Sequence, residues 1–428
     1  MSTIEELYSK LKNLPQGYIS KKTINGNTYY YWQFFENGIL KSKYIKPDDL
    51  NTYRERIKRR KQIEKEIKLT ENQGSGLVKL SKNHRLLSGY LMSGDSVVAS
   101  FMEGVLTFID EDRAPLLIKR SQSIQRFLSQ RIFDDSRVNT RILKKILFIK
   151  ESDPVLISLL VHGASITDNY WFKVKGSKTK YKDIIFSDRY SDTALKGIVY
   201  PLNKKPRLSP ELTLTGSYEK CWKNINNHWW LYKKENHNEL FSELLASKIA
   251  SLLGIPTVEY QFDSGYIKCL NFTEHYNFEP MSSLCEEDDS YERVFNTLYE
   301  LDEHIAFEYL TLMMFDIIVN NVDRHNQNYG LLRDKKTGKI VSLAPNFDNN
   351  LALLSSDPHL NNKEGFLSIF SKFLSKNQIA YRLYKQIHLP LLNEQQIKDA
   401  LKDIPLKCES EDELILYILH RYYKVTVL

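Results

Sequence analysis

The spacing of apolar residues predicts helices in the second half of the chain. Residues 238–253 place leucine and isoleucine at helical intervals and stop at Gly254, which favours a helix end. Residues 305–319 are apolar over almost a whole helical length, which predicts a buried helix. Helical spacing recurs in four segments nearer the C-terminus, at 367–374, 378–387, 394–401 and 411–422. We therefore expect a mainly helical C-terminal part.

Short β-prone segments interrupt these helices. Residues 229–233 are rich in aromatic residues and predict a strand that ends in Lys233. Residues 329–332 and 340–344 predict two further strands, joined by a turn over the polar residues 334–339. Helices and hairpin-linked strands in one chain predict an α+β fold.

The N-terminal residues have a different pattern. Residues 18–45 alternate between β-prone runs and the turn sequences at 25–26 and 36–38, which predicts a three-stranded meander. A proline near position 47 is suited to open a helix, and the helical pattern continues to about residue 69. Residues 72–76 are typical of a linker. We therefore predict a separate module over residues 1–73.

Charge is concentrated in this N-terminal module. Residues 1–76 hold 15 Lys and Arg and nine Asp and Glu, so they carry +6 of the formal net charge of +7 of the 428-residue chain. The predicted middle strand supplies Tyr29, Tyr30, Tyr31, Trp32, Phe34 and Phe35. A basic, aromatic module can bind nucleic acid. The alternative is a small packing module whose helix has a solvated basic face.

Several classes of site are not indicated. The four cysteines lack a C-x-x-C spacing, so neither a zinc site nor a disulfide framework is predicted. The start of the chain has no apolar signal-peptide core, and no run of about 18 apolar residues occurs. We therefore expect a cytoplasmic protein without a membrane span.

The most informative motif follows the apolar segment 305–319. Residues 320–328 read N-N-V-D-R-H-N-Q-N, and residues 345–348 read P-N-F-D. In a phosphoryl-transfer site, one Asp orients the attacking hydroxyl while an Asn and a second Asp hold Mg²⁺ against nucleotide phosphates. Asp323, Asn328 and Asp348 have the spacing for these three roles. The alternative is a polar loop that follows a buried helix.

Residues suited to phosphate binding lie upstream. Gly216 and Ser217 stand at the centre of the segment L-T-L-T-G-S-Y-E-K-C-W, where backbone N–H groups could approach phosphates. An ordinary hairpin turn is the alternative for this segment. Lys233 ends a predicted strand, and Glu243 in the following helix could pair with it. Loop, strand Lys, helix Glu, catalytic loop and metal Asp follow one another as in a kinase.

Taken together, these motifs resemble the HipA family of bacterial serine/threonine kinases, which are often the toxins of toxin–antitoxin pairs. The resemblance covers roughly residues 196–428. It is carried by G-S-Y-E-K at 216–220, L-x-K at Lys233, the S-E-L-L-A-S-K-I-A-S-L-L-G-I helix, D-R-H-x-x-N and A-P-x-F-D. It implies a two-lobed kinase-like core, with an N-lobe over 196–272, a mainly helical C-lobe over 273–428, and a HipA-like N-terminal subdomain or accessory region at 77–195.

The resemblance also implies an activity and its residues. The expected activity is ATP- and Mg²⁺-dependent transfer of a phosphoryl group to a Ser or Thr hydroxyl of a protein substrate, and the expected partner is an antitoxin-like protein. The implied roles are a phosphate loop over 216–220 that includes Lys220, an α/β-phosphate contact at Lys233, a catalytic base at Asp323, and Mg²⁺ ligands at Asn328 and Asp348. The family often phosphorylates itself beside the glycine loop, where this chain has Thr213, Thr215 and Ser217.

Two alternatives remain open. The D-R-H-x-x-N order is also similar to the catalytic loop of phosphoinositide kinases, which would imply a lipid substrate. A nucleotide-binding regulator, or a nucleic-acid-binding protein with a non-catalytic kinase core, would keep the fold without the reaction. In one respect the chain departs from protein kinases, because Asn349 follows Asp348 where they have glycine.

Overall fold

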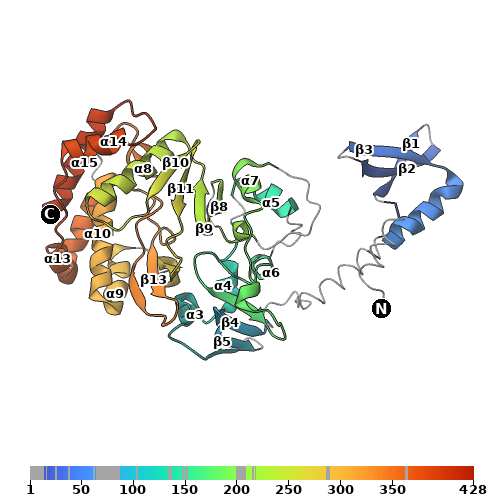
Figure 1. The fold of residues 1–428 in the computed structure, drawn as a ribbon, viewed down its shortest axis with the longest axis horizontal. Coiled ribbons are helices and arrows are strands. Elements are labelled where there is room, and N and C mark those ends of the chain that lie inside the picture. The colour runs from blue at the N-terminus through green and yellow to red at the C-terminus, as the bar shows by residue number, and fades with distance from the viewer. Residues whose placement is uncertain are drawn as a thin grey trace. The chain divides into compact units, whose positions relative to one another are not determined.

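The computed structural model divides the chain into two compact units. One comprises residues 1–83 with 176–178, and the other comprises residues 84–175 with 179–428. The described residues are 14–15, 17–24, 27–36, 39–60, 63, 87–102, 105–133, 137–146, 149, 153–198, 209–214, 216, 218–285, 290–361 and 365–428. Figure 1 shows their helices and strands. The predicted linker, Thr215 and Ser217 lie outside these ranges.

The first unit contains the predicted three-stranded sheet. Strands β1 (Tyr18–Ile24), β2 (Asn27–Glu36) and β3 (Ile39–Ile45) are antiparallel in the order β1-β2-β3. The 3₁₀ turn η1 (Pro47–Asp49) leads into helical residues 50–60. That helix packs on one face of the sheet, since Tyr53 lies 5.6 Å from Trp32 between ring centroids and the Arg54 guanidinium lies 5.4 Å from the centre of the Tyr30 ring.

The second unit begins with a small sheet and short helices. The strands have the order β6-β5-β4-β7 and are antiparallel. Their bounds are β4 (Gly89–Ser93), β5 (Ser96–Met102), β6 (Val105–Phe108) and β7 (Tyr170–Val174). The helices and 3₁₀ turn are α3 (Leu116–Ser121), α4 (Ile124–Ser129), α5 (Thr140–Ile146), α6 (Pro154–Leu159), η3 (Tyr181–Asp183) and α7 (Ser191–Lys196).

A second antiparallel sheet and one long helix come next. The sheet has the order β10-β11-β9-β8, so the predicted strand that ends in Lys233 lies inside it. The elements are η4 (Pro210–Thr213), β8 (Lys220–Ile225), β9 (His228–Lys233), α8 (His237–Leu252), β10 (Tyr260–Asp263) and β11 (Tyr266–Leu270). Helix α8 begins with a capping box in which Asn236 and Glu239 bond to each other's backbone N–H, at 3.0 Å in both directions.

The C-terminal part is helical, as the apolar spacing predicts. Helix α10 contributes most of its length to the largest hydrophobic core, where α8 and α15 also pack (Figure 1). Beside it lies the three-stranded sheet β12-β13-β14. The bounds are β12 (Tyr276–Pro280), η5 (Met281–Ser283), α9 (Tyr291–Leu301), α10 (Glu303–Val319), β13 (Gly330–Asp334), β14 (Ile340–Leu343), α11 (Leu353–Ser356), α12 (Gly365–Lys376), α13 (Gln378–Tyr384), α14 (Glu394–Lys402) and α15 (Glu411–Thr426). The fold is therefore mixed α+β. Among the described residues, no helix has the length and apolar character to cross a membrane.

A buried ion pair joins the region before residue 175 to the sheet β12-β13-β14. Arg333 of β13 pairs with Glu279 of β12, and both side chains are almost fully buried. Glu279 Oε2 accepts a hydrogen bond from the backbone N–H of Leu116 at 2.6 Å, and Oε1 accepts one from the Tyr170 hydroxyl at 3.1 Å. Arg333 also donates to the carbonyl of Ala114 at 2.8 Å. One carboxylate and one guanidinium thus connect β7 and the start of α3 to the sheet β12-β13-β14.

Replacing Arg333 should destabilise the protein strongly. In Arg333→Met, the Glu279 carboxylate stays buried without its cation, so we expect the free energy of unfolding to fall by about 3–5 kcal/mol. The same change at Arg382, whose pair with Glu303 is more than half exposed on both sides, should cost less than about 1 kcal/mol. Urea unfolding of both variants measures this difference, and equal losses would contradict it.

Candidate active site

Three predicted residues meet at the end of strand β9. Lys233 Nζ forms a close ion pair with Asp348 and lies 3.6 Å from Glu243 Oε2. Lys233 comes from a strand, Glu243 from α8, and Asp348 from the loop after β14. Glu243 is fully buried, whereas the Asp348 side chain is 24% exposed. The carboxylate on the accessible side of the lysine is therefore that of Asp348.

The charges of Lys233 and Asp348 support each other. Burial alone would lower the pKa of Lys233, but Asp348 and Glu243 outweigh it and raise that pKa well above its ordinary value. Burial would raise the pKa of Asp348, but Lys233 and Lys220 outweigh it and lower that pKa to about 2. Both groups are therefore charged at neutral pH.

Glu235, which belongs to no motif in the sequence, is also part of this cluster. Carboxylate oxygens of Glu235, Glu243 and Asp348 lie within 4.8 Å of one another. Burial raises the pKa of Glu235 to about 8, against the opposing effect of Lys233. Glu235 stands two residues after Lys233, just beyond the end of β9, and this closeness in sequence was the signal that could have found it.

The predicted catalytic loop is held by bonds within itself. The Asn328 amide nitrogen donates to the main-chain oxygen of Asp323 at 3.0 Å, and the Asp323 N–H donates to Asn321 Oδ1 at 3.2 Å. His325 Nδ1 accepts from the backbone N–H of Gln327 at 3.2 Å, while its Nε2 lies 3.8 Å from Asp323 Oδ2. The Asp323 side chain remains 40% exposed. Asp323 is thus fixed through its backbone while its carboxylate can meet a substrate.

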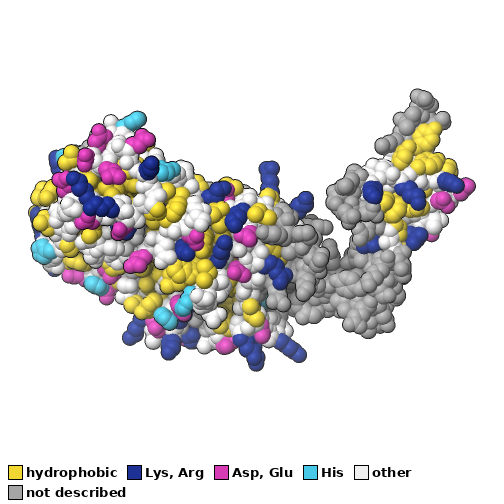
Figure 2. Space-filling view, turned by 45° about the horizontal axis from the view of Figure 1, so that its top comes forward, with side chains coloured by type: hydrophobic (Ala, Val, Ile, Leu, Met, Phe, Trp, Pro, Cys, Tyr) yellow, Lys and Arg dark blue, Asp and Glu magenta, His cyan; other side chains and the backbone are white. Residues whose placement is uncertain are grey.

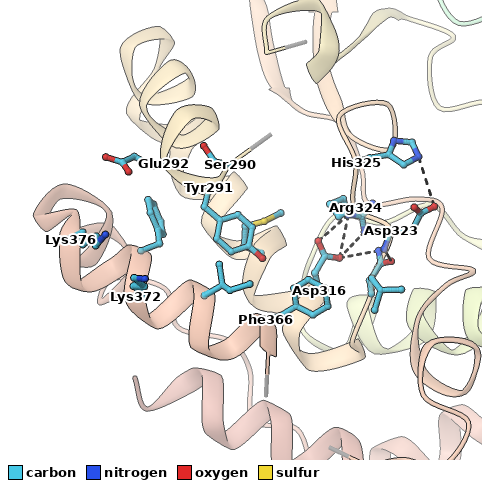
Figure 3. Close-up of a pocket in the computed structure, with 15 residues that line it drawn as sticks. Ser290, Tyr291, Glu292, Asp316, Asp323, Arg324, His325, Phe366, Lys372 and Lys376 are labelled. Atoms are coloured by element: carbon cyan, nitrogen blue, oxygen red, sulfur yellow. Dashed lines mark hydrogen bonds and ion pairs between the residues drawn. The ribbon is translucent and has the colours of Figure 1, made fainter. Parts of the chain in front are cut away.

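Arg324 follows Asp323 in the predicted catalytic loop, and its buried side chain connects three segments of the chain. Its Nε and Nη2 donate to the Asp316 carboxylate of α10 at 3.0 and 2.9 Å (Figure 3). Nη1 donates to the carbonyl oxygens of Asn328 and Phe347, at 2.9 and 2.8 Å. Both side chains of the pair are only 6% exposed. No motif in the sequence marks this pair, although Asp316 is an acidic residue within an apolar helix, and such a residue needs a partner.

The same guanidinium fixes the loop that carries Asp348. Arg324 Nη2 donates to the side-chain oxygens of Asn346 and Asn349, both at 2.7 Å. The Asn349 backbone N–H donates to Glu243 Oε1 at 3.0 Å. These bonds flank Asp348, whose φ of +60° is rare for a non-glycine residue. Asn349, which directly follows Asp348, is therefore a structural anchor here.

The predicted phosphate loop begins at η4. Gly216 has φ +96°, a backbone conformation that side chains other than glycine rarely adopt, so glycine is favoured at this position. Thr213 Oγ1 donates to the carbonyl of Pro210 at 2.8 Å. Arg137 supports the loop from behind by donating to the main-chain oxygens of Glu211, at 3.1 Å, and of Lys220. Arg137 is far away in sequence, so no local pattern could have predicted this contact.

A cavity of about 940 Å³ brings most of the predicted residues together. The predicted residues among those that line it are Thr213, Gly216, Lys220, Lys233, Asp323, Asn328 and Asp348. Glu243 does not line the cavity, because it lies fully buried behind Lys233. The region before residue 175 adds Phe127, Gln130 and Tyr170 to the wall. The cavity has about the volume expected for a small-molecule ligand site.

A second cavity of about 510 Å³ lies beside the predicted catalytic loop (Figure 3). Asp323 and His325 line both cavities. The wall of the second one is formed by aromatic and aliphatic side chains of α9 and α12, with two lysines on α12; among them are Tyr291, Phe366, Ile369, Lys372, Phe373 and Lys376. The Asp323 carboxylate therefore lies where a ligand in either cavity could reach it.

Comparisons with known proteins give a family match at the N-terminus and distant structural likenesses. Residues 2–59 match the family described as a domain of unknown function, DUF6788. The structure is similar to the Helicobacter pylori proinflammatory kinase CtkA, with 20% identity and a TM-score of 0.40 over 48% of this chain and 90% of that one. It is also similar to the Shewanella oneidensis MR-1 toxin–antitoxin system HipA, HipB in complex with operator DNA, with 14% identity and a TM-score of 0.47 over 79% of this chain and 96% of that one. No curated protein matches.

Replacing Arg324 by lysine should loosen the loop around Asp348. Lysine keeps a positive charge for Asp316, but a single ammonium cannot donate to all the acceptors that the guanidinium reaches. We expect faster amide hydrogen exchange over residues 346–350 than in wild type, and little change in α10. Arg382→Lys on the surface serves as the matched control and should change neither segment. Unchanged exchange at 346–350 in Arg324→Lys would show that Arg324 does not anchor this loop.

Buried Glu211 should make stability depend on pH. Burial raises its pKa from 4.5 to about 7. Because the pKa is higher in the folded state, the contribution of Glu211 to the free energy of unfolding is fully present below about pH 4.5. It is lost as the pH rises through about 7. Glu211→Gln cannot lose a proton at this position. Between pH 5 and pH 8 it should therefore keep roughly 2–3 kcal/mol of the free energy of unfolding that wild type loses. Unfolding in urea at both pH values measures this, and exposed Glu413→Gln is the control. Parallel wild-type and Glu211→Gln profiles would contradict it.

Proposed function

We propose that this chain is a kinase that transfers the γ-phosphoryl group of ATP to a Ser or Thr hydroxyl of a protein, with Mg²⁺ as cofactor. One observation carries the proposal. A lysine and an aspartate in direct contact, Lys233 and Asp348, line the same cavity as Asp323 and Asn328. Phosphoryl transfer needs this combination of a phosphate-binding cation, oxygen ligands for a metal, and a carboxylate for the acceptor hydroxyl.

The donor set fits Mg²⁺. Asp348 offers a carboxylate of low pKa, and Glu235 and Glu243 bring further carboxylate oxygens close to it. Asn328 uses its amide nitrogen for the bond to Asp323, which leaves Oδ1 as the atom that a cation would take. Magnesium prefers such oxygen ligands. In the proposal Asp348 and Asn328 hold the ion, and bound Mg²⁺ would neutralise charge on the phosphates.

The remaining roles follow from position and charge. Lys233, charged at neutral pH, would contact the phosphates, with Glu243 behind it to hold its ammonium. The loop at Gly216 and Lys220 would cover the phosphates through backbone N–H groups. Catalysis by such a site depends mainly on positioning and on stabilising the charge of the transferred group.

The acceptor would approach from the second cavity, because Asp323 lines both. Its hydroxyl proton passes to the Asp323 carboxylate while the hydroxyl oxygen forms a bond to the γ-phosphorus. The bond between that phosphorus and the bridging oxygen breaks, and ADP leaves. His325, 3.8 Å from Asp323, accepts a backbone bond through Nδ1 and so braces the loop in this scheme.

Self-phosphorylation is part of the proposal. Thr213 lines the cavity that holds Asp323, and its hydroxyl would have to leave the carbonyl of Pro210 to accept a phosphoryl group. Thr215 and Ser217, the other two candidates, are not among the described residues. The resemblance to HipA kinases adds the expectation of an antitoxin-like partner protein.

Incubation with γ-labelled ATP and Mg²⁺ tests the activity. We expect label on the wild-type protein or on added protein substrate, and a fall of about 100-fold or more in Asp323→Asn, because the acceptor loses its base. Asp348→Asn should also lose labelling. Asp403→Asn, whose side chain is 70% exposed and pairs with Lys248, should label like wild type, and mass spectrometry then locates the phosphate.

Two results would lead to the alternatives. Labelling of phosphoinositide vesicles but not of protein would make the chain a lipid kinase. ATP binding without transfer to any acceptor, unchanged in Asp323→Asn, would indicate a nucleotide-binding regulator. Labelling that persists in both Asp323→Asn and Asp348→Asn would show that the proposed site is not the active site.

A further inference from the structure

The second cavity joins an apolar wall to the carboxylate of Asp323. Ile369 and Phe373 extend into its lining from α12 one helical turn apart, and Tyr291 of α9 lines it too. The rings of Tyr291 and Phe373 meet edge to face, with 6.1 Å between their centroids. Ile369 is 56% exposed, and Val322, directly before Asp323, is 47% exposed. Covering these side chains would remove apolar surface from water, so the cavity favours an occupant with an apolar side chain.

Exposed apolar side chains also occur elsewhere on this protein. On the face drawn in Figure 2, hydrophobic side chains lie in patches among charged ones over the second unit. Exposure alone is ordinary for a folded protein and marks no site. Val322 and Ile369 differ from such residues because they line the same cavity as Asp323, the carboxylate that the proposed reaction needs.

The same lining carries positive charge on α12. Lys372 and Lys376 stand one helical turn apart, and both are exposed. Glu292 of α9 is the opposing charge, whereas Asp316 is neutralised by its buried arginine partner. Beyond the reaction centre at Asp323, the described part of the lining thus sets two cations against one available carboxylate. The charge favours an occupant that brings a carboxylate of its own.

The apolar wall and the lysines follow each other in order from the reaction centre. Figure 3 shows Asp323 toward one end of the view and Lys372 and Lys376 toward the other, with Tyr291 and Phe366 between them. An acceptor hydroxyl held at Asp323 would therefore place a neighbouring side chain against the apolar wall. A residue further along the same segment would reach the two lysines.

We propose that the second cavity selects acceptor Ser or Thr residues that have a large apolar side chain beside them and a carboxylate further along the segment. The inference rests on the proposed kinase reaction and names the class of protein segment that this reaction takes. The cavity of about 510 Å³ has the size of a small-ligand site, so it admits a short segment of a protein and not a folded domain.

The apolar contact should dominate this selection. Burial of one large apolar side chain in the cavity should change the labelling rate by about tenfold. The lysines are exposed, and ion pairs between exposed groups are weakened by water and salt. Their effect on the same rate should therefore be smaller, roughly two- to fivefold.

An array of peptides with a central Ser or Thr and one fixed residue at each neighbouring position tests the proposal, with the full-length protein, Mg²⁺ and γ-labelled ATP. We expect wild type to label peptides with Leu, Ile, Met or Phe beside the acceptor about tenfold more than the array average. Asp or Glu at a further position should raise labelling roughly two- to fivefold. Ile369→Lys should lose the apolar preference, and Lys372→Glu/Lys376→Glu should exchange the acidic preference for a basic one.

Two surface variants on neighbouring helices serve as matched controls. Ile379→Lys on α13 and Lys402→Glu on α14, at positions 42% and 70% exposed, should keep both preferences. ATP binding should be the same in all variants, because the changed residues lie outside the larger cavity. Labelling without either preference, or wild-type preferences in Ile369→Lys and in the double variant, would overturn this inference alone. Absence of label on every peptide and protein would overturn the proposed reaction as well.

Discussion

The buried ion pair between Arg324 and Asp316 is the constraint on which the candidate active site depends. Removing both charges from water is costly, and the geometry must repay that cost with many good hydrogen bonds. Arg324 meets this requirement through bonds to α10, to the predicted catalytic loop and to the loop around Asp348. The same bonds that compensate for burial also set the positions of Asn328 and Asp348, so stability and the placement of the site have one cause.

A second electrostatic balance shapes the cavity. Three carboxyl groups, from Glu235, Glu243 and Asp348, gather around Lys233, and burial together with their mutual repulsion raises the pKa of Glu235 and of Glu243. The positive charge of Lys233 stabilises the ionised carboxylate of Asp348, while burial raises the pKa of Glu235 to about 8. A nucleotide phosphate would compete with Asp348 for Lys233, and a divalent cation would take over the neutralisation of Asp348. A site balanced in this way is suited to bind the two together.

Much of this site could be predicted from the sequence, and what was missed has physical reasons. The helix at 303–319 and the strands around the 334–339 turn follow from local periodicity. The sequence motif also singled out Asp323, Asn328 and Asp348, which line one cavity. The role of Arg324 depends on a fold that brings Asp316 and Asn346 to one guanidinium, yet Asp316 in an apolar helix was a visible signal. The contact of Arg137 with the main chain of Lys220 in the predicted phosphate loop joins residues 83 positions apart, which no local pattern records.

Isothermal titration of ATP into the full-length protein, with and without Mg²⁺, tests the central claim most directly. The account predicts that wild type binds ATP, that Mg²⁺ tightens the binding, and that Asp348→Asn loses this Mg²⁺ dependence because the variant lacks the carboxylate that would hold the ion. Absence of ATP binding, or binding of equal strength with and without Mg²⁺ in both proteins, would contradict it. In that case the cavity around Lys233 would not be a nucleotide site.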